Sequence, residues 1–339
     1  MCIYLFIYLF SQVCRSTGRL VLKEAVIREV VDDGCTFGTG GHSRALLSLA
    51  LTTTIMACAQ MSLCAAKSAG FKIRQPKTTS TRRVVVKAAG FEEELKATAQ
   101  KIASAGRGIL AMDESNATCG KRLDSIGVEN TEENRRRYRE LLVTTKGLGE
   151  FISGAILFEE TLYQSASDGT KFVDCLNNEN IVPGIKVDKG LVPLPNSNGE
   201  SWCQGLDGLA MRTAEYYSAG ARFCKWRAVV SIPAGPSEMA VKECAHGLAR
   251  YAAIAQDNGL VPIVEPEILL DGEHDIDTTF AVGQKVWAEV FKQLADFGVM
   301  NEGILLKPSM VTPGAEASAK NTPEQVGQAR GAVCVWYVA

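Results

Sequence analysis

From residue 91 onward, amphipathic stretches alternate with short, nearly continuous apolar runs. In the amphipathic stretches, apolar residues recur every three or four positions, which predicts helices with one buried face. The continuous runs are typical of strands that are buried on both faces. Helices are predicted at residues 92–104, 131–144, 206–219, 237–257 and 278–297. Strands are predicted at residues 108–112, 154–158, 181–187, 222–231, 261–264 and 303–306.

Strands that alternate with helices indicate parallel βαβ units, which build either a doubly wound sheet or a (β/α)8 barrel. Charged residues at the strand ends favour the barrel, because a barrel gathers all those ends at one mouth. A doubly wound sheet would concentrate its site at a single crevice. Burying the charges singly would be costly, so they should meet each other or a ligand. They are Asp113, Lys186, Lys225, Glu265 and Lys307.

The overall composition limits the classes of partner. The formal net charge is −2, so no global field attracts nucleic acid or an anionic membrane. The apolar segment MCIYLFIYLF at the start is shorter than the about 20 residues that span a bilayer. The 11 cysteines form no C-x-x-C pair and only three histidines occur, which disfavours a disulfide framework or a zinc site. We expect neither a metal nor another cofactor.

The first 89 residues differ in composition from the rest. No acidic residue occurs between Asp33 and Glu92, whereas Lys, Arg, Ser, Thr and Ala are frequent there. This composition is typical of an organelle transit peptide. We therefore divide the chain into an atypical extension (1–55), a predicted chloroplast transit peptide (56–89), a barrel region (90–325) and a divergent tail (326–339). A disordered basic tail is the alternative for the second segment.

Three lysines and two carboxylates at strand ends suggest amine catalysis. A lysine at a buried strand end is a candidate for imine formation with a ketone, because desolvation and a neighbouring cation both favour the neutral amine. Carboxylates can then move protons while the imine forms and a carbon–carbon bond breaks. The imine supplies the electron sink that would otherwise require a carbonyl polarised by zinc.

Seven segments resemble class I fructose-bisphosphate aldolases, and the resemblance runs almost continuously from about Glu92 to Gln325. It implies a lyase of glycolysis and the Calvin cycle that cleaves fructose 1,6-bisphosphate through a Schiff base. It also implies a plastid stromal location and a homotetramer. Loss of the family's seventh and eighth strands would weaken the packing of that tetramer. The segments are GILAMDES (108–115), GAILFEETLYQ (154–164), GIKVDKGLVPL (184–194), QGLDGLA (204–210), ARFCKWR (221–227), VPIVEPEILLDGEHD (261–275) and EGILLKPSMVTPG (302–314).

The resemblance assigns catalytic roles residue by residue. It makes Lys307 the Schiff-base lysine and Glu265 the proton shuttle for imine formation. Lys225 flanks and activates the imine, and Asp113 handles the proton of the C4 hydroxyl.

The resemblance also assigns residues to substrate binding. Lys186 and Arg227 contact the distal phosphate, and Arg122 lies near the phosphate sites, where a plain surface charge is the alternative. For Glu267 the alternative is a supporting role beside the lysines, and Asp188 is expected to be structural.

After residue 325 the resemblance stops, and the family's seventh and eighth strands have no counterpart. We therefore expect an incomplete (β/α)8 barrel in which the strands at 108–112 and 303–306 have unpaired edges. A catalytically inactive remnant of an aldolase is the alternative function.

Overall fold

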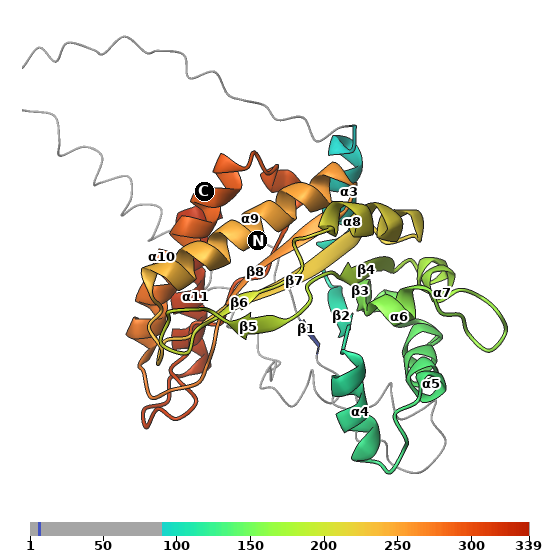
Figure 1. The fold of residues 1–339 in the computed structure, drawn as a ribbon, viewed down its shortest axis with the longest axis horizontal. Helices are drawn as coiled ribbons and strands as arrows, with labels where there is room; N and C mark the ends of the chain where they lie inside the picture. Colours follow the sequence, from blue (N-terminus) through green and yellow to red (C-terminus); the bar gives the residue numbers. More distant parts are fainter. Residues whose placement is uncertain (1–5, 8–89, 339) are drawn as a thin grey trace, which may run out of the picture. The chain divides into compact units, whose positions relative to one another are not determined.

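A parallel sheet organises the described part of the chain. The computed structural model describes residues 6–7 and 90–338, with side chains for residues 90–331. The sheet has seven strands in the order β1-β2-β3-β4-β7-β8-β9, and every neighbouring pair is parallel. A separate antiparallel hairpin joins β5 to β6. Figure 1 shows α9 and α10 lying along β7 and β8, as in the wall of a barrel.

Six strands lie where the apolar runs predict them. They are β2 (Gly108–Met112), β3 (Ile152–Leu157), β4 (Val182–Lys186), β7 (Phe223–Val230), β8 (Val261–Ile268) and β9 (Leu305–Leu306). The sequence predicts no strand at β1 (Phe6–Ile7), which pairs with Ile109 and Leu110 of β2. An unpaired edge at 108–112 is therefore wrong for those two residues, whereas β9 is terminal in the sheet order.

Five helices confirm the amphipathic spacing to within a few residues at each end. They are α3 (Glu92–Ile102), α5 (Glu132–Val143), α8 (Leu209–Ser218), α9 (Glu238–Asp257) and α10 (Ile276–Asp296). Side-chain caps fix three of the starts, because an oxygen before the first turn accepts an otherwise unpaired backbone N–H. The capping residues are Thr131 for α5, Ser237 for α9 and Asp275 for α10.

Several elements were not predicted by the apolar periodicity. The helices are α4 (Asn116–Asp124), α6 (Glu159–Leu162), α7 (Phe172–Asn178) and α11 (Pro323–Val338). The hairpin consists of β5 (Leu191–Pro193) and β6 (Ser201–Cys203), and two 3-10 turns, η1 (Leu148–Glu150) and η2 (Asn301–Gly303), precede β3 and β9. The predicted extension and transit peptide lie outside the described residues, apart from residues 6–7.

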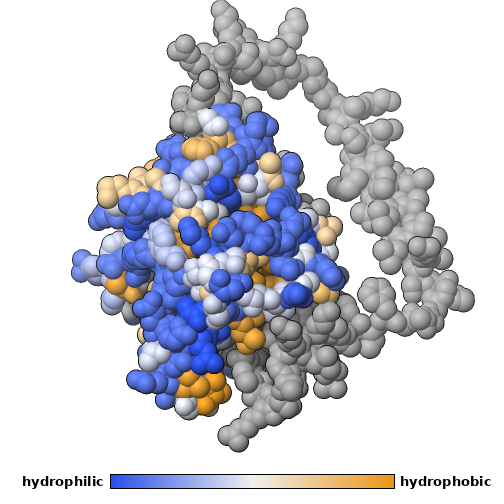
Figure 2. Space-filling model, turned by 90° about the vertical axis from the view of Figure 1, so that its right-hand side faces the viewer, coloured by the Kyte–Doolittle hydropathy of each residue, from blue (hydrophilic) through white to orange (hydrophobic). Residues whose placement is uncertain are grey.

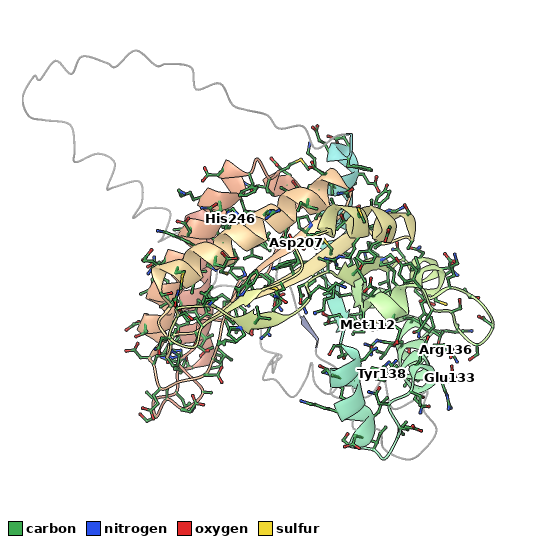
Figure 3. All side chains as sticks on the ribbon, viewed as in Figure 1. Met112, Glu133, Arg136, Tyr138, Asp207 and His246 are labelled. Carbon is green, nitrogen blue, oxygen red and sulfur yellow. The ribbon has the colours of Figure 1, made fainter. Side chains whose placement is uncertain are left out.

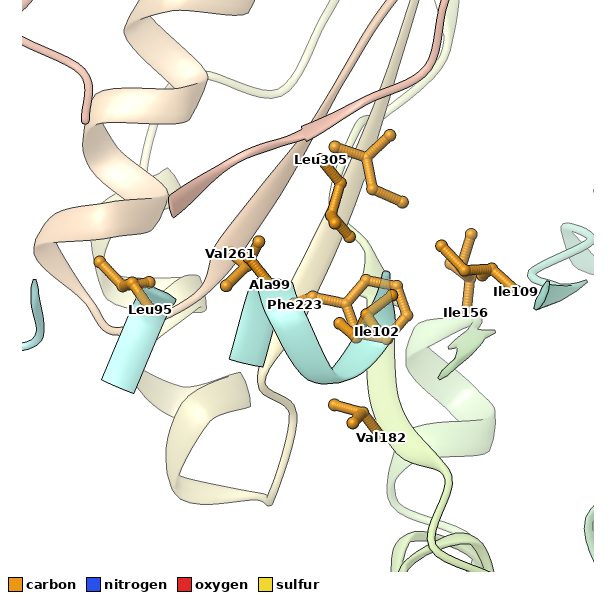
Figure 4. Packing of buried hydrophobic residues seen from close by; sticks show 10 residues of the cluster. Leu95, Ala99, Ile102, Ile109, Ile156, Val182, Phe223, Val261 and Leu305 are labelled. Atoms are coloured by element: carbon orange, nitrogen blue, oxygen red, sulfur yellow. The ribbon is translucent and has the colours of Figure 1, made fainter. Parts of the chain in front are cut away.

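Apolar side chains close the sheet at the end where its strands begin. Leu95, Ala99 and Ile102 of α3 pack against inward-facing apolar residues of the strands, and Figure 4 shows this cluster. We call it the floor. Its strand members include Ile109, Ile156, Val182, Phe223, Val261, Ile263 and Leu305. Because the floor fills one end of the inner face, the opposite end, where the strands finish, is left for polar side chains.

The surface of the described part is predominantly hydrophilic on the face shown in Figure 2. Large exposed apolar side chains include Met211, Tyr163 and Ile126, which belong to different elements or loops. Among the described helices, none is both long enough and apolar enough to cross a bilayer.

Replacing Gly184 of β4 with alanine should destabilise the protein, because the added Cβ would overlap the buried ring of Phe223. That ring belongs to the floor and cannot move without displacing its neighbours, so a loss of about 1–3 kcal/mol of unfolding free energy is expected. Urea unfolding followed by circular dichroism measures it.

Gly247→Ala is the matched control, since this glycine lies inside α9 and nothing lies within 4 Å of the position that an added Cβ would take. Alanine there should leave stability unchanged or raise it by about 0.5–1 kcal/mol. Equal unfolding free energies for Gly184→Ala and the unmodified chain would contradict the steric argument.

Candidate active site

Strand β7 directs alternate side chains to opposite faces of the sheet. Trp226 points outward and stacks on Tyr251 of α9, with 5.4 Å between the ring centroids. Phe223 points inward and belongs to the floor. Lys225 and Arg227 follow at steps of two, so they lie on the same inner face, closer to the carboxyl end of the strand. The period of two therefore places both cations inside the sheet and above the floor.

Lys307, the residue after β9, meets Glu265 of β8. Its backbone N–H donates to Val264 O at 3.0 Å, which fixes the lysine at the end of the sheet. Lys307 Nζ lies 2.5 Å from Glu265 Oε1. Glu265 is 2% exposed, and its Oε2 is buried with no hydrogen-bond partner in the described part of the chain. An amine beside such a carboxylate is suited to proton exchange with a bound ligand.

Lys225 forms a second buried pair, with Asp113 at the end of β2. The Nζ–Oδ2 distance is 3.0 Å, and the two residues are 4% and 9% exposed. β2 and β7 are separated by β3 and β4 in the sheet order, a spacing of about 14 Å in a flat sheet. The contact is made across the inner face because the sheet curves, which is the geometry of an open barrel wall.

Lys186 is the last residue of β4 and pairs with Asp188 in the loop that follows the strand. It is the register neighbour of Lys225 on β7. Its Nζ donates to Asp188 Oδ1 at 2.8 Å, and the Lys186 side chain is 21% exposed. Two like charges on neighbouring strands are thus each matched by a separate carboxylate.

Arg227 forms a two-pronged ion pair with Glu267 of β8. Its Nε and Nη2 donate to the two carboxylate oxygens at 2.6 and 2.9 Å. Burial acts to raise the pKa of Glu267, but the hydrogen bonds from Arg227 and the positive charges of Arg227, Lys307 and Lys225 outweigh it. The pKa of Glu267 is therefore below its ordinary value, and the carboxylate stays charged.

Arg122 lies on α4, away from the strands. It is connected to the site through Glu114, the residue after Asp113. It forms an ion pair with Glu114 and donates to Tyr138 Oη at 3.4 Å; Tyr138 of α5 is labelled in Figure 3. Arg139 holds the same loop by donating to the backbone oxygen of Glu114 at 2.9 Å. The arginine is partly buried in a polar network, unlike a plain surface charge.

The structure brings six of the seven predicted residues together on the inner face of the sheet above the floor, within β7 and β8 or at the ends of β2, β4 and β9, and Arg122 is connected to this group through Glu114. We call Asp113, Lys186, Lys225, Arg227, Glu265 and Lys307 the strand-end cluster. Glu267 pairs directly with Arg227, and the nearby charges of Lys307 and Lys225 also act on it. The pairing roles of Asp188 and Glu114 were missed, although each lies within two residues of a predicted site residue. In the described part of the chain, no three His, Cys, Asp or Glu side chains gather in a metal-binding arrangement.

Glu267→Gln should remove part of the protein's pH dependence of stability. A carboxyl whose folded pKa lies below the ordinary 4.5 contributes stability above that pH, and the contribution is lost as the pH falls through the folded pKa. Both partners are about one third exposed, so solvent screening limits the loss at pH 7 to about 0.5–1 kcal/mol. In urea unfolding measured from pH 7 down to pH 3, the unfolding free energies of Glu267→Gln and the unmodified chain should converge. Arg227→Gln should converge with the unmodified chain in the same way. A difference in unfolding free energy that stays constant from pH 7 to 3 would show that the ion pair does not cause the pH dependence.

Comparison with known proteins is consistent with this geometry. Fructose-bisphosphate aldolase 1, chloroplastic, of Chlamydomonas reinhardtii is 72% identical over 249 residues, which cover 74% of this chain and 66% of the relative. The chloroplastic aldolase of Oryza sativa subsp. japonica is 74% identical over 246 residues, covering 73% and 63%. The chain thus spans slightly less than two thirds of the length of these relatives.

A solved structure gives the same result for the fold. Fructose-bisphosphate aldolase from Plasmodium falciparum, in complex with TRAP and a small-molecule inhibitor, is 56% identical with a TM-score of 0.72. The match covers 74% of this chain and 73% of that one. Residues 94–334 also match the family model described as fructose-bisphosphate aldolase class-I, a span that contains the whole strand-end cluster. The chain therefore belongs to the class I fructose-bisphosphate aldolase family.

Proposed function

We propose that this chain reversibly cleaves fructose 1,6-bisphosphate to dihydroxyacetone phosphate and glyceraldehyde 3-phosphate through a Schiff base on Lys307. The observation that carries the proposal is the 2.5 Å contact between Lys307 Nζ and the buried carboxylate of Glu265. A reactive amine needs a group that can exchange protons during loss of water, and Glu265 is in reach of it. The names of the relatives support the same reaction.

Each member of the two buried pairs has a role in the chemistry. The neutral amine of Lys307 attacks the C2 carbonyl, and Glu265 protonates the hydroxyl that leaves as water, which gives the imine. Asp113 then takes the proton from the C4 hydroxyl. The C3–C4 bond breaks, and its electron pair passes into the protonated imine to give an enamine. Lys225, 3.0 Å from Asp113, stabilises negative charge near the reacting carbons.

Release of the second product reverses these proton transfers. Protonation of the enamine at C3 restores the imine, and addition of water frees dihydroxyacetone phosphate and the Lys307 amine. Lys186 and Arg227 bind the distal phosphate, for which an ammonium and a guanidinium fork are suited. Arg122 contributes from α4 near the phosphate sites. A homotetramer is part of the same proposal.

The alternative, an inactive remnant, has less support. The four residues proposed for catalysis form two close pairs, at 2.5 Å and 3.0 Å, that are buried or nearly so. A chain released from selection for catalysis would have no reason to retain buried charges, which are costly to maintain.

Borohydride reduction in the presence of dihydroxyacetone phosphate should attach the ligand to Lys307, because reduction converts the imine to a stable secondary amine. Peptide mass mapping locates the adduct. Lys307→Arg should give no adduct, since a guanidinium forms no imine under these conditions. Glu265→Gln should slow adduct formation by about 10²–10⁴-fold through loss of the proton donor.

Lys285→Arg is the matched control, because Lys285 lies on α10 and pairs with the exposed Glu238. It should label at Lys307 like the unmodified chain. Labelling spread over surface lysines, or an adduct that persists in Lys307→Arg, would exclude the proposed Schiff-base site.

We also propose that residues 56–89 direct the chain to the plastid stroma. The acid-poor composition of the segment and the chloroplastic names of the relatives support this. A fusion of residues 56–90 to a green fluorescent protein should accumulate inside chloroplasts of a transfected leaf cell. The same fusion with Arg82→Glu and Arg83→Glu should stay outside, and uptake that ignores this charge reversal would contradict the proposal.

A further inference from the structure

Asp188 is a buried acid to which the proposed reaction gives no role. The residue is 8% exposed and lies just beyond β4. Its Oδ1 accepts from Lys186 Nζ at 2.8 Å and from the backbone N–H of Gly190 at 3.1 Å. Its Oδ2 is buried and has no hydrogen-bond partner among the residues that the structure describes. A charged carboxylate in this position is held mainly by its contact with Lys186.

The loop that carries Asp188 is fixed on both sides. The backbone N–H of Val187 donates to Lys225 O at 3.0 Å, and Arg212 of α8 donates to Val187 O at 2.9 Å. On the other side, the N–H of Lys189 donates to Gln204 O at 2.8 Å. The carboxylate therefore has a defined position, and the long, flexible lysine side chain is the member of the pair that adapts.

Lys186 needs such a fixed partner because of its neighbour. It lies in register with Lys225, so two ammonium groups project from adjacent strands onto one face. Lys225 is held by Asp113, and its side chain is 6% exposed, whereas that of Lys186 is 21% exposed. Without the charge on Asp188, Lys186 would lose its paired carboxylate, and solvent would compete for its partly exposed ammonium.

We propose that Asp188 is a positioning residue that holds the Lys186 ammonium where it binds the distal phosphate of a sugar bisphosphate. An ammonium has three N–H donors, so one can stay with Asp188 Oδ1 while two remain for phosphate oxygens. Asp188 thereby determines the preference for substrates with two phosphates over substrates with one. This inference rests on the proposed function, because it takes the distal phosphate subsite from it.

The test measures binding without catalysis. Glucitol 1,6-bisphosphate and glucitol 1-phosphate have no carbonyl group, so neither forms an imine, and calorimetry gives a Kd for each. Asp188→Asn retains the shape of the side chain but removes its charge. It should weaken binding of the bisphosphate by about tenfold, the scale of one charge-assisted contact, and change binding of the monophosphate less than twofold.

Three further variants separate positioning from general support. Lys186→Ala should lose the same bisphosphate preference, and the double variant Lys186→Ala/Asp188→Asn should bind no more weakly than Lys186→Ala. Asp188→Glu, which keeps the charge, should recover part of the preference. Asp257→Asn, at the exposed end of α9, should bind both ligands like the unmodified chain.

Two results would overturn the inference. One is equal weakening of both ligands by Asp188→Asn, which would make Asp188 a structural support only. The other is an unmodified chain that binds both polyol phosphates equally, since no distal phosphate contact would then exist to be positioned. Failure of borohydride trapping at Lys307 would count against the Schiff base and leave the binding comparison intact.

Discussion

The strand-end cluster depends on the pairing of each buried or half-buried cation with a carboxylate. Removing an ammonium and a carboxylate from water costs several kcal/mol each, and only close pairing with good hydrogen bonds compensates for it. Lys307, Lys225, Lys186 and Arg227 each have a carboxylate oxygen within 3.0 Å. The acids come from β8, the end of β2 and the loop after β4. The cluster therefore exists only when these strands are assembled on one curved sheet.

The inner face of the sheet carries both the apolar floor and the charged strand-end cluster, because inward-facing residues change from apolar to charged along strands such as β7 and β8. On β7 the order from the floor upward is Phe223, Lys225, Arg227, and on β8 it is Val261, Ile263, Glu265, Glu267. Apolar residues at the strand beginnings pack against α3 and are excluded from water. Charged residues at the strand ends face one another, where an anionic sugar phosphate would complete their coordination.

Much of the fold could be predicted because its largest elements have strong, local signals. Helix α9 shows regular apolar spacing over twenty residues and starts at a capping serine, and β7 is an apolar run ended by a turn. Helix α4 was missed because it is only nine residues long and only Cys119, Gly120 and Leu123 are buried. The hairpin strands have three residues each, too few for a periodicity to emerge.

The individual site residues could be predicted, but several of their partners could not. The identity of Lys225 as a strand-end lysine is local information, whereas its contact with Asp113, 112 positions away, depends on the curvature of the sheet. Asp188 and Glu267 were difficult for another reason. Each lies inside a recognisable motif, but the motif does not show whether the charged group faces solvent or pairs with a cation.

The floor also has a consequence for how the chain is made. Helix α3 is near the start of the described region, and one of the residues that cover it, Leu305, is synthesised about two hundred residues later. At about 5–20 residues per second, Leu95 waits on the order of 10–40 s for that contact. During this interval only the floor residues that are already synthesised, such as Ile109 and Ile156, can cover the apolar face of α3. Part of that face therefore stays open to water until β9 (Leu305–Leu306) has left the ribosome.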